Sequence, residues 1–575
     1  MAAARGRRHL PKRLRLRDVS DGWHPAASEV DEAIDLVTRA GVAHALEELL
    51  ARRTDARQRL SVLGLEVARI INASRDGHHG SHLELLRILN DLPNETLERL
   101  GMDRWRRRGG YDRVQRLTAA LERVLDEGVE YLNPKTGDTV VCDWAWHARS
   151  MLLSPIPADL LDAMEGNTAL AVDGTEMESC GQFHGELAAV DADGEAAGPV
   201  DADANASGST GRRKTKAKVL GIGADGRKIY TKDNDARAGW RTGNAKHEAG
   251  YYIGREAHLG VAVRRIVRTD GVHWIKFGPE VPPVIITADV VPAGTHRAKA
   301  VVPSLLEAAS AGLCADVVAD AGYTNTKPDT FALPLQRAGV PVTLRLVPAQ
   351  RGEKPGVGAA RQIDGHPFAA QLPEDLVNPP MPPLGASNDE KAPYIEEFNR
   401  RAPYRYRRIK APGSDGTTRW ENPVNAGALR SRQVPRSMRN STKAPLIELE
   451  EGADLRTVTA GADDLPTWQP TLFGTSAWHE AMGRRQQVES VNSFLHGAVG
   501  SLTDISRGYT KLRHSGRIKL FLVATLVGYN RRVIARWEQD HGSAGSLTPL
   551  PGAPKRRAPR RDRARHYEDL PAIAG

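Results

Sequence analysis

Two short apolar segments constrain the fold of this chain more than any other feature. Residues 168–174 read TALAVDG and residues 314–323 read CADVVADAGY, and each apolar run reaches an aspartate, Asp173 in the first and Asp320 in the second. Short apolar runs bounded by polar turns are typical of buried strands in a sheet that is covered on both faces. We expect each strand to end at its aspartate. If the two strands are neighbours, the two carboxylates lie side by side.

The segments around these runs predict alternating strands and helices. Three of them suit a β-meander: REAHLGVAVRRIV (255–267), GVHWIKFGP (271–279) and PPVIITADVV (282–291). A helix is expected over residues 302–312, and another near residues 328–339, before the strand VPVTLRLVP (340–348). The expected fold class is therefore α/β with a mixed sheet.

A late segment, RRQQVESVNSFLH (484–496), predicts an amphipathic helix. Its apolar residues recur at helical spacing and form one stripe: Val488, Val491 and Leu495. A polar stripe runs beside it: Arg485, Glu489, Asn492 and His496. A solvated helix face would show the same pattern. Packed across the sheet, however, this helix would bring Glu489 to the two aspartates.

Three clustered carboxylates indicate divalent cations, because without them the negative charges repel one another. Oxygen ligands favour Mg²⁺ or Mn²⁺, and two such ions about 3.5–4 Å apart suit in-line phosphoryl transfer. Asp316 is an alternative to Asp320, but it precedes the apolar run and so lies at the other end of the strand. The pattern predicts nuclease or strand-transfer chemistry.

The ordered motifs resemble the ribonuclease H-like core of DDE transposases from bacterial insertion sequences. The similar blocks are VDGTEMES (172–179), YYIGREAHLGVAV (251–263), VADAGYTN (318–325) and RRQQVESVNSFLH (484–496). In the last block of the family an arginine precedes the glutamate by four residues, as Arg485 precedes Glu489. The resemblance covers roughly residues 168–540. It departs from the family where Met482 replaces a tyrosine and His496 replaces a lysine.

The resemblance implies that Asp173, Asp320 and Glu489 are catalytic ligands of two Mg²⁺ or Mn²⁺ ions, and that Arg485 and His496 contact DNA phosphates. The expected activity is nicking at transposon ends, followed by transfer of the 3′-hydroxyl end into target DNA. Double-stranded DNA is the expected partner, bound by a homodimer. No nucleotide cofactor is expected, because the sequence lacks GxxxxGK[ST]. A metal-dependent nuclease without strand transfer and a catalytically inactive DNA-binding protein are the alternatives.

A further segment, DNDARAGWRTGN (233–244), combines arginines with an aromatic residue. Arg237, Trp240 and Arg241 suit stacking on a DNA base or contact with the backbone, and a plain loop is the alternative. The three cysteines show no CxxC spacing, which argues against a disulfide framework or a thiolate zinc site. No apolar run approaches the length of a membrane span, and no secretory signal is evident. We expect a bacterial cytoplasmic protein associated with the nucleoid through DNA.

The chain of 575 residues is too long for one core, and its net charge of +9 favours a polyanionic partner. The basic charge is concentrated in the arm 1–27 and the tail 541–575, which we expect to be flexible. Between them we expect a helical DNA-binding region over 28–165. The ribonuclease H-like core would occupy 166–350, with a disordered insertion at 188–217, and 477–540. Residues 351–476 predict an irregular or β insertion, with helix returning only at about Ser476.

Overall fold

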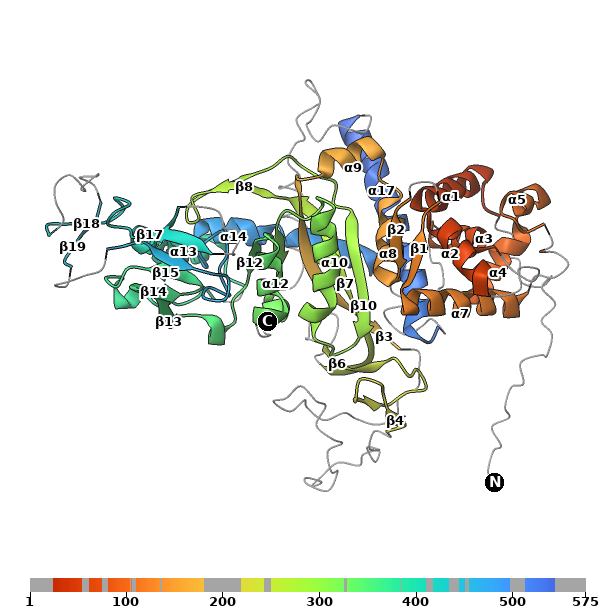
Figure 1. The fold of residues 1–575 in the computed structure, drawn as a ribbon, viewed down its shortest axis with the longest axis horizontal. Coiled ribbons are helices and arrows are strands. Elements are labelled where there is room, and N and C mark those ends of the chain that lie inside the picture. Colours follow the sequence, from red (N-terminus) through yellow and green to blue (C-terminus); the bar gives the residue numbers. More distant parts are fainter. Residues whose placement is uncertain are drawn as a thin grey trace. The chain divides into compact units, whose positions relative to one another are not determined.

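The protein is described by a computed structural model, which contains two compact units (Figure 1). The described residues are 24–53, 61–74, 81–103, 105, 110–134, 137–179, 219–241, 250–324, 328–383, 385–409, 417–433, 444–449, 455–496 and 512–542. The first unit holds the described residues of Met1–Ser154 and the start of the last helix, to Gly528. The second holds those of Pro155–Gly497 and the rest of that helix, from Tyr529. The expected insertion at 188–217 and most of both basic ends lie outside the described residues.

The first unit is helical, as the sequence predicted. Its helices are α1 (Ala27–Ala40), α2 (Val42–Arg53), α3 (Val62–Ser74), α4 (His82–Asp91), α5 (Asn94–Arg99), α7 (Tyr111–Glu127) and α8 (Trp144–Leu153). A hairpin of β1 (Val129–Leu132) and β2 (Thr139–Cys142) joins α7 to α8. Arg69 of α3 is fully buried, forms an ion pair with Glu66 at 2.6 Å and donates to Thr118 Oγ1 of α7 at 3.2 Å. This polar contact ties α3 to α7 inside an otherwise apolar core.

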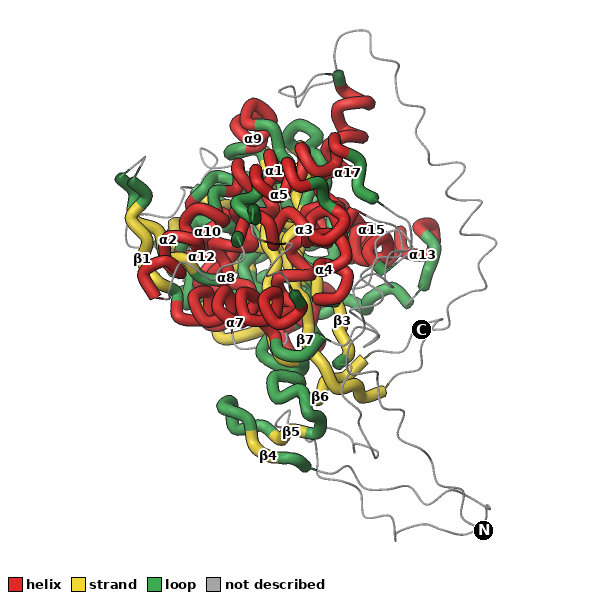
Figure 2. The backbone as a smooth tube through the Cα atoms, turned by 90° about the vertical axis from the view of Figure 1, so that its right-hand side faces the viewer, coloured by secondary structure: helices red, strands yellow, loops and turns green. Residues whose placement is uncertain are grey.

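The second unit is built on a mixed sheet with the strand order β10-β7-β3-β11-β12. Its strands are β3 (Thr168–Glu178), β7 (Gly250–Arg264), β10 (Ile285–Pro292), β11 (Val317–Ala319) and β12 (Val342–Leu344). The pairs β10–β7 and β7–β3 are antiparallel, whereas β3–β11 and β11–β12 are parallel. A further strand, β6 (Arg237–Arg241), pairs with the first part of β7. Figure 2 shows β3 and β7 running out toward β6 and the small ribbon of β4 (Gly221–Ile222) and β5 (Lys228–Ile229).

Helices cover both faces of this sheet. On one side α10 (Arg297–Ser310) packs against β7 and β10 and is followed by α11 (Ala321–Thr324) and α12 (Ala332–Arg337) along the chain. Helix α14 (Ser476–Gly483) packs against β11 and β12, and α15 (Gln486–Leu495) packs against β3 and β7. The last helix, α17 (Ser515–His541), is attached to β10 by Asn530, which accepts from Ile285 N and donates to Ile285 O, both at 2.8 Å. No helix of the described chain is long and apolar enough to cross a membrane.

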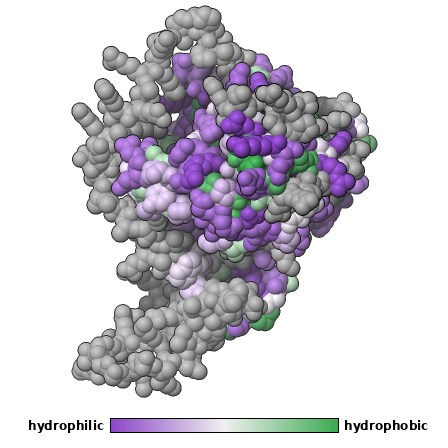
Figure 3. All heavy atoms as spheres, turned by 90° about the vertical axis from the view of Figure 1, so that its left-hand side faces the viewer, coloured by the Kyte–Doolittle hydropathy of each residue, from purple (hydrophilic) through white to green (hydrophobic). Residues whose placement is uncertain are grey.

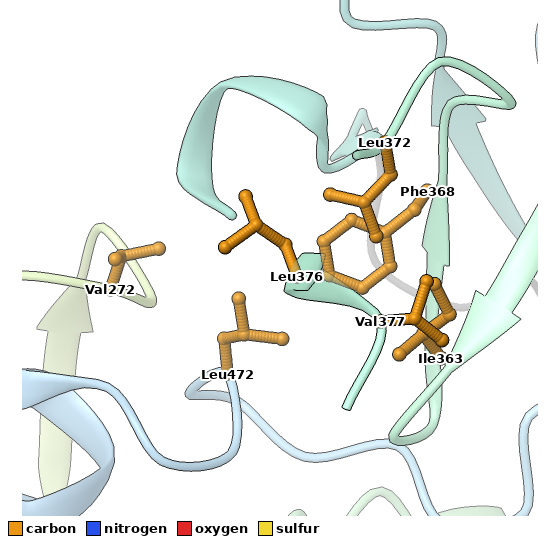
Figure 4. Packing of buried hydrophobic residues seen from close by; sticks show 7 residues of the cluster. All are labelled: Val272, Ile363, Phe368, Leu372, Leu376, Val377 and Leu472. Atoms are coloured by element: carbon orange, nitrogen blue, oxygen red, sulfur yellow. The ribbon is translucent and has the colours of Figure 1, made fainter. Parts of the chain in front are cut away.

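Residues 351–476 form small sheets with cores of their own. The antiparallel sheets are β13 (Glu353–Val357), β14 (Ala360–Ile363) and β15 (His366–Phe368), and β16 (Arg407–Arg408), β17 (Thr418–Glu421) and β20 (Val458–Ala460). A parallel pair joins β18 (Arg430–Ser431) to β19 (Leu446–Ile447). Figure 4 shows how one apolar cluster of this region, with Phe368 and Leu376 among its members, includes Val272 from the turn between β8 (Ile266–Thr269) and β9 (Ile275–Phe277). Seen from the side of residues 351–476, the described surface is largely hydrophilic with scattered hydrophobic patches (Figure 3).

Three expectations about elements are wrong. The strand β3 does not end at Asp173 but continues to Glu178, because the long β7 pairs with it throughout. The middle strand of the expected meander, β9 (Ile275–Phe277), lies outside the central sheet and pairs with β8 (Ile266–Thr269). Helix also returns well before Ser476, in α13 (Asn388–Asn399), which Ser387 caps by accepting from Glu390 N.

Candidate active site

Asp173 and Asp320 lie side by side because β3 and β11 are parallel neighbours. Val172 is in register with Ala319, so each aspartate is the next residue along its strand. The two strands are therefore neighbours, which was the condition for the two carboxylates to lie side by side. The Oδ1 atom of Asp173 accepts from Gly174 N at 3.0 Å, and Oδ1 of Asp320 accepts from Gly322 N at 2.7 Å. These bonds leave both Oδ2 atoms to make other contacts.

Helix α15 delivers the third carboxylate. Its apolar stripe is buried as predicted, with at most 1% of Val488, Val491 and Leu495 exposed. The helix packs on β3 and β7 through this stripe. The neighbouring polar stripe is consequently held beside the C-terminal half of β3, although 43% of the Glu489 side chain stays exposed.

The three acidic residues meet at the guanidinium group of Arg485. Its Nη2 atom lies 2.8 Å from Glu489 Oε1, 3.9 Å from Asp173 Oδ2 and 4.0 Å from Asp320 Oδ2. The side chain of Arg485 is 19% exposed, so this contact occurs in a partly dehydrated site where charges interact strongly. Residues that are 147 and 169 positions apart in sequence are thus gathered around one atom.

Two further residues of the polar stripe reach the same strand. Asn492 Nδ2 donates to Asp173 Oδ2 at 3.3 Å, while its buried Oδ1 has no partner within the described structure. His496 Nε2 lies 2.5 Å from Thr175 Oγ1, two residues beyond Asp173 on the same face of β3. The sequence placed Asn492 on this stripe, but nothing in the sequence assigned it or Thr175 a role.

The environment of Asp173 disfavours its charged form. The pKa of Asp173 is raised to about 6, chiefly by burial and in smaller part by the negative charges of Asp320 and Glu489, while Arg485 opposes the increase. A bound cation would remove this penalty by neutralising the carboxylate. The cluster is therefore electrostatically suited to an added positive charge.

Asp316, the alternative to Asp320, has a structural role at the other end of β11. It is buried, and its Oδ1 accepts from Arg484 Nη1 at 2.6 Å. Its Oδ2 accepts from Ile266 N at 2.9 Å. Consecutive arginines thus reach opposite ends of one strand, with Arg484 at Asp316 and Arg485 at Asp320.

The opposite face of β3 is supported by a buried pair that sequence reasoning did not assign. Tyr323 OH lies 2.8 Å from His258 Nδ1, and burial lowers the pKa of His258 to about 3, so this imidazole is neutral at neutral pH. A Cβ atom at Gly174 would lie 2.8 Å from His258 Nδ1, which explains why glycine follows Asp173. Both His258 and Tyr323 lie in the blocks that carry the family resemblance, and this was the available signal.

The structure does not bring Arg237 and Trp240 to the acidic cluster. On β7, the partner of Arg237 is Gly254, five residues and about 17 Å of extended strand from the residue opposite Asp173. Arg237 is 5% exposed and its guanidinium donates to Asp225, so burial and pairing occupy the charge. Trp240 lies farther along β6, is 50% exposed and meets Tyr251 edge to face. The side chain of Arg241 lies outside the described residues.

Comparison of the chain with family models, curated proteins and solved structures found no match. The chemistry of the cluster therefore rests on its own residues. Within the described part of the chain, no three His, Cys, Asp or Glu side chains are already gathered as a metal site, because the acids surround Arg485 instead. The donor set nevertheless fits a hard divalent cation, since it offers three carboxylates and the buried, unpartnered Oδ1 of Asn492.

Proposed function

We propose that the protein is a DDE-type DNA transposase with a ribonuclease H-like catalytic core. The observation that carries this proposal is the convergence of Asp173, Asp320 and Glu489, from β3, β11 and α15, on one point within 4.0 Å of Arg485 Nη2. The mixed sheet supports it, because β3 lies between the antiparallel β7 and the parallel β11. The parallel pairing of β3 with β11 places Asp173 beside Asp320. The motif order in the sequence supports it independently.

Asp173, Asp320 and Glu489 would hold two Mg²⁺ or Mn²⁺ ions. Bound there, the ions would activate the attacking water or 3′-hydroxyl and stabilise the leaving oxygen. Asn492 orients Asp173 through its hydrogen bond to Oδ2. Arg485 and His496 would contact the DNA phosphates beside the ions. No side chain is required as a covalent nucleophile.

The helical first unit and the basic ends would bind the DNA ends, within a homodimer that brings two ends together. The proposed setting is the bacterial nucleoid, and the partner is double-stranded DNA at the transposon ends and at the target. No nucleotide cofactor enters the proposed reaction. A DNA-binding protein without catalysis is the second candidate, and Met482 and His496 at two positions of the family signature favour it.

The test is cleavage and joining of labelled DNA carrying the sequences that flank this gene, with Mg²⁺ or Mn²⁺. Asp173→Asn, Asp320→Asn and Glu489→Gln each keep the side-chain size and remove one charge. Glu397→Gln on α13 is the matched control, because Glu397 is 42% exposed and paired with Arg400, much as the 43% exposed Glu489 is paired with Arg485. We expect joined products with wild type and the control, and none with the three variants.

Nicked products without joining would indicate a nuclease. Tight DNA binding by the wild type without any nick would leave the second candidate.

A further inference from the structure

We propose that Arg485 is a built-in counter-cation of the acidic cluster, which holds the three carboxylates together until a divalent cation replaces it. This inference rests on the proposed function, because it concerns how the same site takes up its metal. A DNA phosphate would attract the guanidinium group away from the carboxylates, and the centre of the cluster would then be open to a metal ion. Metal uptake would then be coupled to DNA binding, and the metal-dependent chemistry would be restrained in the absence of DNA.

The guanidinium group and a metal ion compete for one place. The Nη2 atom has one close contact, to Glu489 at 2.8 Å, and lies about 4 Å from both aspartates. An Mg²⁺ ion needs oxygen ligands at about 2.1 Å, so the carboxylates must close on the ion where the guanidinium now lies. A permanent positive charge at this distance also repels a divalent cation directly.

Arg485 makes fewer close contacts than the arginine before it, although each has one buried nitrogen without a partner among the described residues, Nε in Arg485 and Nη2 in Arg484. Arg484 donates to Asp316 at 2.6 Å and to the backbone oxygens of Arg264 and Ala481 at 3.0 and 3.1 Å. The Nε atom of Arg485 is buried but has no hydrogen-bond partner among the described residues. A buried donor without a partner is unfavourable, so it offsets part of the attraction that holds Arg485 beside the carboxylates.

The destination of the released guanidinium follows from its chemistry. A guanidinium group binds a phosphate through two parallel hydrogen bonds, which would satisfy donors that the cluster leaves unpaired. Because Arg485 is the residue before α15, its backbone can stay in place while the side chain turns. The DNA backbone is therefore the partner that would bind the Arg485 guanidinium when a metal ion takes its place in the cluster.

The test is to measure Mn²⁺ binding to the full-length protein without DNA by isothermal titration calorimetry. Arg485→Gln removes the charge, Arg485→Lys keeps it, and Arg400→Gln is the control, because Arg400 forms an exposed pair with Glu397 on α13. We expect Arg485→Gln to bind Mn²⁺ about 10-fold more tightly than wild type, because the competing cation is gone. Arg485→Lys should stay near wild type, and Arg400→Gln should not change the affinity.

Thermal melting gives a second readout that does not depend on activity. Without metal, Arg485→Gln should melt at a lower temperature than wild type, because the three carboxylates then repel one another without a counter-ion. Mn²⁺ should raise its melting temperature more than that of wild type. Unchanged or weaker Mn²⁺ binding by Arg485→Gln, with binding still lost in Asp173→Asn, would overturn the inference alone. Absence of Mn²⁺ binding by every variant would overturn the proposed function as well.

Discussion

At the scale of single residues, Asp173 illustrates the energetic cost of gathering three acidic side chains in one place. Its pKa is raised to about 6 from an ordinary value of 3.8. A carboxyl group whose folded-state pKa is raised destabilises the folded protein increasingly between about pH 4 and pH 6, and fully above that range. The metal-free protein therefore carries this penalty at neutral pH.

We expect metal-free Asp173→Asn to be more stable than wild type at pH 8, by about 1–3 kcal/mol, because one pKa unit corresponds to about 1.4 kcal/mol. The gain should shrink to less than about 1 kcal/mol at pH 4, because the carboxyl group is then protonated in the folded chain and only partly ionised in the unfolded chain. Urea denaturation at both pH values, with EDTA present, measures it. An equal gain at pH 4 and pH 8 would show that packing, and not the charge, is responsible.

Candidate site residues could be predicted where a local sequence pattern marked them. Asp173, Asp320 and Glu489 were found because each follows a strand pattern or interrupts a helical stripe. The bond between Asn492 and Asp173 joins residues 319 positions apart, and no local pattern contains such a contact. Arg237 shows the converse, since its segment resembled an exposed basic site, but tertiary contacts bury the side chain against Asp225.

At the scale of elements, one buried ion pair ties the α14–α15 segment to the sheet. Arg484 and Asp316 are 6% and 4% exposed and lie 2.6 Å apart. We expect Arg484→Gln to lower the free energy of unfolding by about 3–5 kcal/mol, because it leaves the carboxylate of Asp316 buried without its partner. The double variant Arg484→Gln with Asp316→Asn removes both charges and should recover much of that loss. Urea denaturation of the single and double variants measures this coupling, and strictly additive losses would contradict it.

Elements were predictable where burial follows sequence hydrophobicity. The apolar runs of β11 and β12 and the stripe of α15 are buried as their patterns predicted. The end of β3 was not predictable, because its polar residues to Glu178 stay in the sheet only through pairing with β7. The same holds for β9, whose alternation suits a strand in the central sheet as well as the separate ribbon that it forms with β8.

At the scale of the whole molecule, the proposed function assigns DNA binding to the basic ends and catalysis to the acidic cluster. The first 17 residues hold seven Lys and Arg and no Asp or Glu. Basic arms bind DNA by releasing counter-ions from phosphates, so their contribution is independent of sequence and falls steeply with salt. Binding by these arms and chemistry at the acidic cluster should therefore be separable by mutation.

We expect a variant with all seven of these basic residues replaced by Gln to bind DNA more weakly at low salt, with a shallower dependence of log affinity on log salt concentration. The replaced residues are Arg5, Arg7, Arg8, Lys12, Arg13, Arg15 and Arg17. Fluorescence anisotropy between about 50 and 200 mM salt measures this slope. Glu489→Gln should keep the wild-type slope while losing cleavage, because the proposed role of Glu489 is to hold metal ions and not to neutralise DNA phosphates. A slope unchanged by the seven replacements would assign the phosphate contacts to the folded units instead of the arm.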